Sequence, residues 1–150
     1  MHTTIARWIE FDSGHRVPNH ESKCRHPHGH RYRVNVIVHG PVINDQARAD
    51  DGMVVDFGVV KQVLMAKVHD VLDHAFIVDQ RDTLMLQALA IPATLGLDPW
   101  RVVVVPFAPT AENLAAWVFA EIEPTLRSCR LTLEAVEVYE TPTSKATVNR

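Results

Sequence analysis

A histidine-rich segment near the N-terminus holds the residue types in this sequence that are best suited to metal chemistry. Five of the nine histidines fall in one 16-residue window: His15, His20, His26, His28 and His30. His28 and His30 stand two residues apart, and in an extended chain side chains i and i+2 point to the same face. Both imidazoles can therefore reach one metal ion.

A catalytic zinc site usually has three protein ligands and an open position. His15 is the favoured third ligand, because it follows a predicted strand that we expect to pair with the strand beginning near His30. His20 and His26 compete for this role, and their spacing excludes neither of them. The plain alternative is that the His-x-His pattern is only a polar start to a strand.

Cys24 lies four residues before His28, between Lys23 and Arg25. Neighbouring positive charge and a nearby metal favour the thiolate, which is the reactive form of cysteine. Three roles stay open for Cys24: a fourth zinc ligand, a catalytic base or nucleophile, and an inert loop thiol. Cys129 has no such neighbours and is predicted to be structural.

Further positions carry groups suited to proton transfer or ligand recognition. Asp73 and His74 are adjacent, and such a pair can orient itself for proton transfer, although a polar helix end explains it too. Glu140 ends a predicted strand, where it is either an ordinary surface residue or a bidentate acceptor for a guanidine-like edge. Thr110 is well explained as a helix cap, and Glu112 shares this ambiguity between capping and function.

Strands and helices must position these groups, and their patterns are segregated along the chain. Strands are predicted over residues 3–12, 31–39 and 131–140, with a short last one over 147–150. Helices are predicted from Asp56 to about Leu72 and from Thr110 to Leu126, with Pro124 ending or kinking the second. Between them lie a helical fragment (84–89) and a β-branched run (102–105). This order predicts an α+β fold, with two main helices on one face of an antiparallel sheet.

Length and composition favour an ordinary globular protein. The 150 residues predict one domain spanning 1–150, and 47% hydrophobic residues are enough to fill its core. The net charge of −3 gives no reason to expect nucleic acid or a membrane surface as a partner. No apolar run approaches a membrane span, and no signal peptide pattern is seen. Two cysteines are too few for a disulfide framework, so we expect a cytoplasmic protein.

Six stretches are together similar to the family of 6-pyruvoyl-tetrahydropterin and 6-carboxytetrahydropterin synthases. They occur in the family's order: FDSGHR (11–16), CRHPHGH (24–30), GMVVDF (52–57), LDH (72–74), PTAEN (109–113) and VYET (138–141). The gap of three residues between Cys24 and His28 resembles that of the bacterial 6-carboxy enzymes of queuosine biosynthesis. The stretch from about 82 to 107 departs from the family by being longer than in its compact members.

The resemblance implies the tunnelling fold, in which small α+β subunits join edge to edge into barrels. Such proteins are commonly homohexamers of two trimers with active sites at subunit interfaces. It also implies residue roles: zinc ligands His15, His28 and His30; general base Cys24 with its partners Asp73 and His74; and pterin contacts from Glu140 and Thr110.

The activity implied is zinc-dependent conversion of 7,8-dihydroneopterin triphosphate to 6-carboxy-5,6,7,8-tetrahydropterin, with release of triphosphate and acetaldehyde. Five basic residues near the histidines suit a triphosphate: Arg16, Lys23, Arg25, Arg31 and Arg33. One rival is a 6-pyruvoyl-type synthase that eliminates triphosphate without cleaving the side chain. Another is a non-enzymatic binding module with a closed zinc site that includes Cys24.

Overall fold

The computed structural model describes residues 3–150. Within them, six strands form one sheet in the order β4-β3-β1-β2-β5-β6. The strands are β1 (Thr3–His15), β2 (His28–Gly40), β3 (Ala75–Asp79), β4 (Val102–Val105), β5 (Thr132–Thr141) and β6 (Ser144–Asn149). The helical elements are η1 (Lys23–Arg25), α1 (Phe57–Leu64), the π-helical η2 (Met65–His69), α2 (Asp70–Leu72), α3 (Thr83–Thr94) and α4 (Ala111–Ser128).

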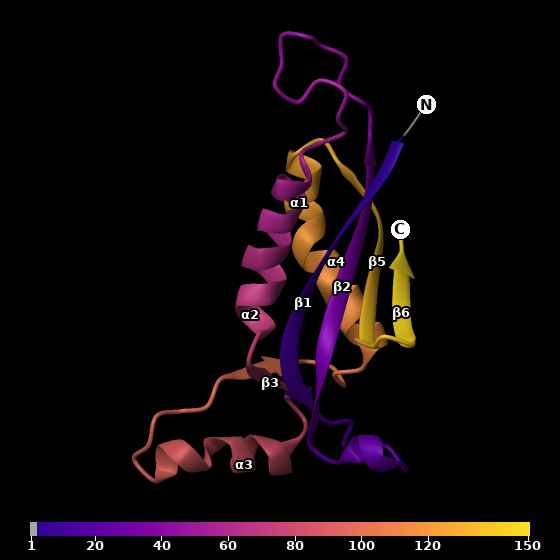
Figure 1. Ribbon diagram of the computed structural model, residues 1–150. Coiled ribbons are helices and arrows are strands. Elements are labelled where there is room, and N and C mark those ends of the chain that lie inside the picture. The colour runs from indigo at the N-terminus through magenta and orange to yellow at the C-terminus, as the bar shows by residue number, and fades with distance from the viewer. Residues whose placement is uncertain (1–2) are drawn as a thin grey trace.

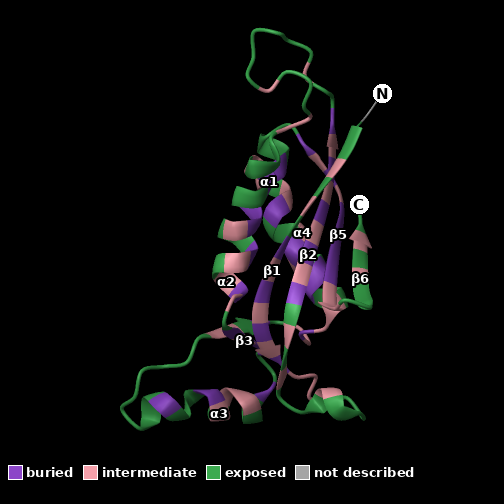
Figure 2. Cartoon of the chain, in the orientation of Figure 1, coloured by how far each residue is buried: buried purple, intermediate pink, exposed green. Residues whose placement is uncertain are grey.

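One layer of helices covers one face of the long strands (Figure 1). The consecutive elements α1, η2 and α2 form one half of this layer, and α4 lies beside them. The core fills the space between these helices and the sheet, with Phe11 and Tyr32 from the strands and Leu64, Leu114 and Ile122 from the helices. Figure 2 shows this burial on the inner sides of α4 and the strands. The predicted α+β class, with helices on one face, is confirmed.

The sheet is mixed, which corrects the prediction of an antiparallel sheet. β1, β2, β5 and β6 pair antiparallel in succession, but β3 pairs parallel with β1, and β4 pairs parallel with β3. The helices α1 and α2 carry the chain from one end of the sheet back to the other, as a parallel connection requires. β3 was not predicted because a five-residue apolar run has no period that separates strand from helix.

Both central strands are longer than predicted at the end that matters for function. β1 continues to His15 and β2 begins at His28, so residues assigned to a loop have strand geometry. β6 likewise begins at Ser144 rather than at residue 147. Helix α4 continues through Pro124 to Ser128, because a proline inside a long helix removes one backbone hydrogen bond without ending it here.

The long segment between β3 and α4 has regular structure. Its helical fragment extends to the whole of α3, and the β-branched run Val102–Val105, which was not assigned to a strand, forms β4. In Figure 1, α3 lies across the lower end of the sheet, apart from the helices α1, α2 and α4. None of the helices within residues 3–150 combines the length and the apolar character that crossing a membrane requires.

Candidate metal centre and active site

The register of β1 against β2 brings the three predicted zinc ligands together. His15 lies directly opposite His28, and Ser13 lies opposite His30. Opposite residues of an antiparallel pair project to the same face, and so do residues two apart on one strand. The ring centroid of His15 therefore lies 4.7 Å from that of His28 and 5.0 Å from that of His30. One nitrogen from each ring lies within 4.8 Å of the other two, which makes this group a candidate metal site.

Backbone carbonyls orient two of these rings. Nδ1 of His15 donates to the carbonyl oxygen of Pro109 at 2.6 Å, and Nδ1 of His28 donates to that of His26 at 2.7 Å. With the proton on Nδ1, each Nε2 keeps a lone pair for a metal. Nε2 of His15 and Nε2 of His30 are buried and have no hydrogen-bond partner among the described residues. Unpaired buried nitrogens that lie this close together fit the ligand set of a metal ion.

Burial also keeps the histidines in their ligand form. Loss of solvent is the main cause that lowers the pKa of His15 to about 4; the positive charge that His28 and His30 can carry contributes to this, and the bond to Pro109 opposes it. Burial lowers the pKa of His30 as well, and the positive charge that His28 can carry is a second, smaller cause of this lowering. Neutral imidazole is the form that binds metals. Both rings are therefore ready to bind at neutral pH.

A cavity of about 320 Å³ adjoins the three histidines. Its walls come from the loop of residues 16–27 (the Cys24 loop), the first turn of α4, the end of β5 and the start of β6. Cys24, Thr110 and Glu140, which were predicted to be functional, line it. Oε1 of Glu140 lies 3.7 Å from Nε2 of His15. The strand ends thus bring together residues from four separate parts of the sequence.

The surroundings of Glu140 in this cavity shift the pKa of its carboxyl group. Burial raises the pKa of Glu140, and the nearby Glu112 raises it further. The hydroxyl of Thr110 accepts a hydrogen bond from the backbone N–H of Asn113, so its predicted role as the cap of α4 is confirmed. Glu112 also lines the cavity, and the sequence left it unassigned between capping and function. Its place in the first turn of a predicted helix, two residues after Thr110, was the available signal.

Asp73 and His74 form the predicted pair. Nδ1 of His74 donates to Oδ2 of Asp73 at 2.7 Å, while Oδ1 accepts from the backbone N–H of Asp12 at 3.0 Å. The latter bond is the larger cause that lowers the pKa of Asp73, and His74 adds to it. His74 has a φ of 57°, a left-handed conformation that is uncommon outside glycine, and its backbone N–H donates to the carbonyl of Asp12. Its side chain is 77% exposed.

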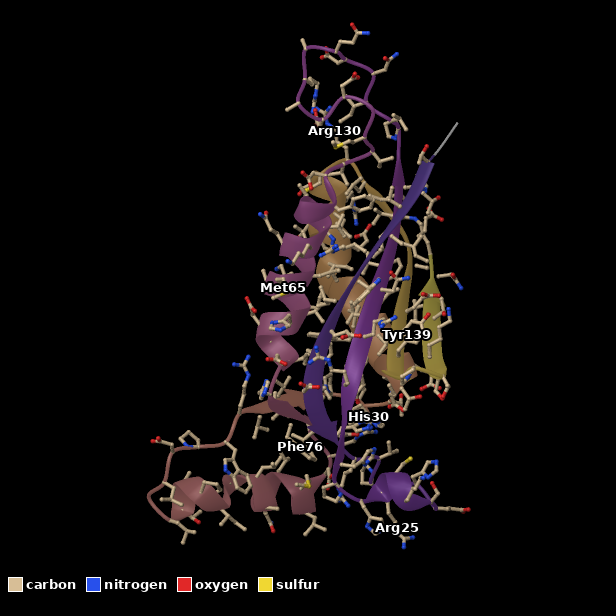
Figure 3. All side chains as sticks on the ribbon, in the orientation of Figure 1. Arg25, His30, Met65, Phe76, Arg130 and Tyr139 are labelled. Atoms are coloured by element: carbon tan, nitrogen blue, oxygen red, sulfur yellow. The ribbon has the colours of Figure 1, made fainter. Side chains whose placement is uncertain are left out.

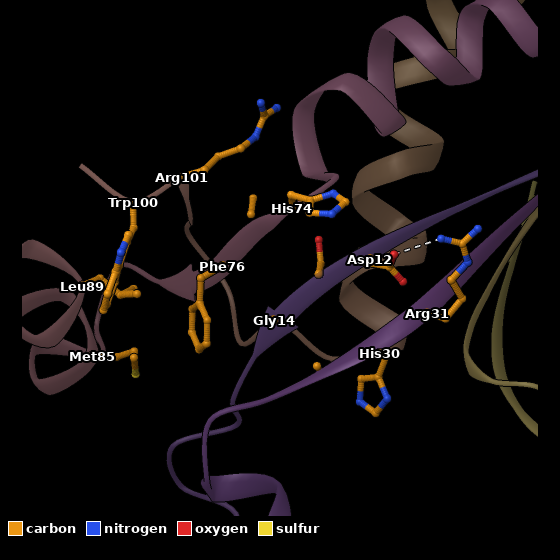
Figure 4. Close-up of a pocket in the computed structure, with 13 residues that line it drawn as sticks. Asp12, Gly14, His30, Arg31, His74, Phe76, Met85, Leu89, Trp100 and Arg101 are labelled. Atoms are coloured by element: carbon orange, nitrogen blue, oxygen red, sulfur yellow. Dashed lines mark hydrogen bonds and ion pairs between the residues drawn. The ribbon is translucent and has the colours of Figure 1, made fainter. Parts of the chain in front are cut away.

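A single chain does not bring His74 to Cys24. Within residues 3–150, His74 lines a second cavity, of about 710 Å³, which includes Phe76, Trp100 and His30 but not Cys24. Figure 4 shows the rings of His30, on β2, and of His74, just before β3, on opposite sides of the pair of strands β1 and β2. Gly14 forms the floor between them, and a Cβ there would come within 2.8 Å of the Phe76 ring. The pair of Asp73 and His74 thus lies away from the cavity of Cys24, with the side chain of His74 exposed.

The remaining basic and histidine residues divide between structural and cavity positions. His20 lines the cavity that contains Cys24, and its Nδ1 accepts a hydrogen bond from the backbone N–H of Ser22. His26 is exposed. Neither histidine belongs to the group formed by His15, His28 and His30. On the uncovered face of the sheet, Arg31 and Arg33 pair with Glu10, and Arg31 also pairs with Asp12. These two arginines are therefore already engaged with carboxylates.

Known proteins resemble this chain over nearly its whole length. The family model described as 6-pyruvoyl tetrahydropterin synthase matches residues 4–150. A 6-carboxy-5,6,7,8-tetrahydropterin synthase of Haemophilus influenzae is 31% identical over 140 residues, which is 93% of this chain and 94% of the relative. A protein of the same name from Synechocystis sp. is 35% identical over 146 residues, covering 95% of this chain and 89% of the relative.

Solved structures agree with the sequence relatives. An uncharacterised protein of Wolinella succinogenes superposes with a TM-score of 0.81 at 28% identity, over 100% of this chain and 99% of that one. The 6-pyruvoyl tetrahydropterin synthase of Caenorhabditis elegans shares the fold with a TM-score of 0.69 at 22% identity, over 100% of this chain and 96% of that one. The predicted resemblance is confirmed, and the chain belongs to the 6-pyruvoyl tetrahydropterin synthase family.

Proposed function

We propose that this chain is a zinc-dependent 6-carboxytetrahydropterin synthase of queuosine biosynthesis. Its substrate is 7,8-dihydroneopterin triphosphate, and its products are 6-carboxy-5,6,7,8-tetrahydropterin, triphosphate and acetaldehyde. The observation that carries this proposal is the convergence of His15, His28 and His30 on the wall of a cavity that also holds Cys24 and Glu140. The names of the bacterial relatives support the choice of product.

The three histidines suit zinc by number, type and protonation. Three neutral imidazoles with an open side toward a cavity are typical of catalytic zinc rather than of closed structural sites. Cys24 lies outside the three-ligand group, which argues against a closed site with cysteine as fourth ligand. When bound there, zinc supplies Lewis-acid polarisation to oxygens of the substrate side chain.

The protein side chains supply binding and proton transfer. Glu140 accepts hydrogen bonds from N2 and N3 of the pterin, and Thr110 lines the pocket for the same ring. The thiolate of Cys24 takes a proton from the substrate side chain, since it lines the cavity beside the histidines. His74, oriented by Asp73, relays this proton.

A second copy of the chain completes the site in this proposal. His74 is exposed and lines a different cavity from Cys24, so the proton relay needs His74 of a neighbouring copy. Apolar surface for such packing is present, because Trp100, which lines the same cavity as His74, is one of six exposed large apolar side chains between residues 84 and 104: Leu84, Ile91, Leu95, Leu97, Trp100 and Val104. A homohexamer of two trimers, closed into a barrel, fits this arrangement.

The proposed enzyme acts as one catalytic domain spanning residues 1–150 in the cytoplasm. A continuous core cluster runs from Ile9 in β1 to Val138 in β5, which supports one domain. Cys24 and Cys129 are both free thiols, as a reducing compartment would keep them.

The deciding experiment is to incubate zinc-loaded protein with 7,8-dihydroneopterin triphosphate and to measure acetaldehyde and the pterin product together. Acetaldehyde with 6-carboxytetrahydropterin is expected. Triphosphate release with a 6-pyruvoyl product and without acetaldehyde would replace the proposal by the rival synthase. No turnover by the zinc-replete protein would favour the binding module instead.

A further inference from the structure

One buried ion pair ties the Cys24 loop to the long segment between β3 and α4. Nε and Nη2 of Arg16 each donate to a carboxylate oxygen of Asp82, both at 2.6 Å. The side chain of Arg16 is 14% exposed and that of Asp82 only 3%. Two parallel charge-assisted bonds give this pair a fixed geometry as well as strength.

The remaining guanidinium nitrogen of Arg16 binds the Cys24 loop itself. Nη1 of Arg16 donates to the carbonyl oxygen of Arg25 at 3.2 Å. The backbone N–H of Val17 donates to the carbonyl oxygen of Cys24 at 2.9 Å. In Figure 3, Arg25 lies beyond His30 at the lower end of the molecule, on the turn that carries Cys24. The position of the Arg16 guanidinium therefore helps to set the position of the turn.

Asp82 is in turn fixed by the helix that follows it. Its Oδ1 accepts from the backbone N–H of Met85 at 3.1 Å, which caps α3, and its carbonyl accepts from Leu86 at 3.0 Å. Its backbone N–H donates to the carbonyl of Asp79, the last residue of β3, at 2.9 Å. The carboxylate that holds Arg16 is thus attached to both β3 and α3.

We propose that Asp82, acting through Arg16, is a positioning residue that holds the Cys24 loop against the zinc-site cavity. This gives the N-terminal end of the segment 82–107 a role in the reaction. The catalytic consequence rests on the proposed function, but the restraint on the loop does not. Without the ion pair, the turn keeps only bonds made within the Cys24 loop, such as that from Arg25 to the carbonyl of Glu21, and Cys24 moves more freely.

The restraint is tested by the reactivity of Cys24. In a Cys129→Ser background Cys24 is the only thiol, since the chain has two cysteines. Asp82→Asn keeps the size and capping ability of the side chain but loses its charge. Arg16→Lys keeps the charge but loses the paired bonds. Both changes are expected to raise the rate of Cys24 alkylation by iodoacetamide, at the high-pH plateau, about ten-fold, the factor that corresponds to about 1.4 kcal/mol.

Asp79→Asn is the matched control. Asp79 is also buried, with its side chain 4% exposed, and also pairs with an arginine, but that partner is Arg81 on the same turn. Alkylation of Cys24 in this variant is expected to match the parent. Equal acceleration in Asp79→Asn would overturn the proposal, because it would indicate general loosening. Unchanged rates in Asp82→Asn and Arg16→Lys would overturn it as well.

Steady-state kinetics test the consequence for catalysis. With the pterin triphosphate, Asp82→Asn is expected to lower kcat about ten-fold while KM and zinc content stay unchanged, because the ring anchor Glu140 and the histidines are not altered. A wild-type kcat would overturn the positioning role. Alkylation requires no substrate, so it still decides the restraint on the loop if the parent protein fails to convert the pterin.

Discussion

Two cavities adjoin the same end of the sheet, and His30 lines both of them. The larger, about 710 Å³, includes the apolar side chains of Phe76, Met85, Leu89 and Trp100. The smaller, about 320 Å³, holds the three histidines, Cys24 and two carboxylates. Size alone would direct attention away from the smaller cavity. Buried nitrogens without partners and shifted pKa values, which are common at functional sites, are found at the smaller one.

The contrast also shows what one chain can assemble. Strand register brings the proposed metal ligands and Glu140, the proposed ring anchor, together on the core side of β1, β2 and β5. His74 follows the end of α2 in a left-handed turn, and it faces the larger cavity. We infer that the two cavities belong to one catalytic system only when a second copy brings His74 to Cys24.

Removal of a metal ligand is expected to have the largest effect. In His28→Ala the two remaining imidazoles cannot hold zinc, so both metal content and turnover fall below detection. Metal analysis of the purified protein measures this directly. His26→Ala is the control, because it lies in the same histidine cluster but outside the three-ligand group, and it should keep its zinc. A zinc-replete and active His28→Ala protein would show that the ligand set is wrong.

Loss of the thiol separates catalysis from metal binding in the smaller cavity. Cys24→Ala is expected to keep full zinc occupancy and to lower kcat by about 10²–10⁴, the usual contribution of a positioned general base. Zinc stoichiometry and kcat are measured on the same preparation. Retained turnover would remove Cys24 from the mechanism.

Mixing two inactive variants tests whether the two cavities meet between copies. Cys24→Ala and His74→Ala chains, co-expressed with different tags, can form sites that take Cys24 from one chain and His74 from another. Random mixing gives about a quarter of such sites both Cys24 and His74, so roughly a quarter of the wild-type activity should return. If both residues act within one chain, the mixture stays as inactive as either variant alone.

The ion pair between Arg16 and Asp82 predicts a smaller, pH-dependent effect on stability. Arg16 lowers the pKa of Asp82 below its usual range in the folded protein. Its stabilisation is therefore present above the ordinary carboxyl pKa and lost as pH falls through the lowered one. Asp82→Asn should lower the free energy of unfolding by about 2 kcal/mol at neutral pH. In denaturant titrations the difference from wild type should shrink on acidification; a difference that is constant with pH would disagree with this assignment.

The sequence by itself determined the family, the α+β class and most of the elements. Period-two and helical patterns located β2, β5, α1 and α4, since amphipathic elements of this length leave a clear periodic signal. The spacing of His28 and His30, with His15 at the end of the preceding strand, was enough to predict the ligand group, because strand geometry fixes the faces of residues two apart.

Only the tertiary structure decided which groups share a cavity. β3 is too short to carry a period, so neither the parallel pairing of β3 nor the outward direction of His74 was predictable from local patterns. The same holds for Glu112 and for the bond between Arg16 and Asp82, which joins residues 66 positions apart. Local sequence specifies elements and faces, whereas contacts between distant segments depend on how those elements pack against one another.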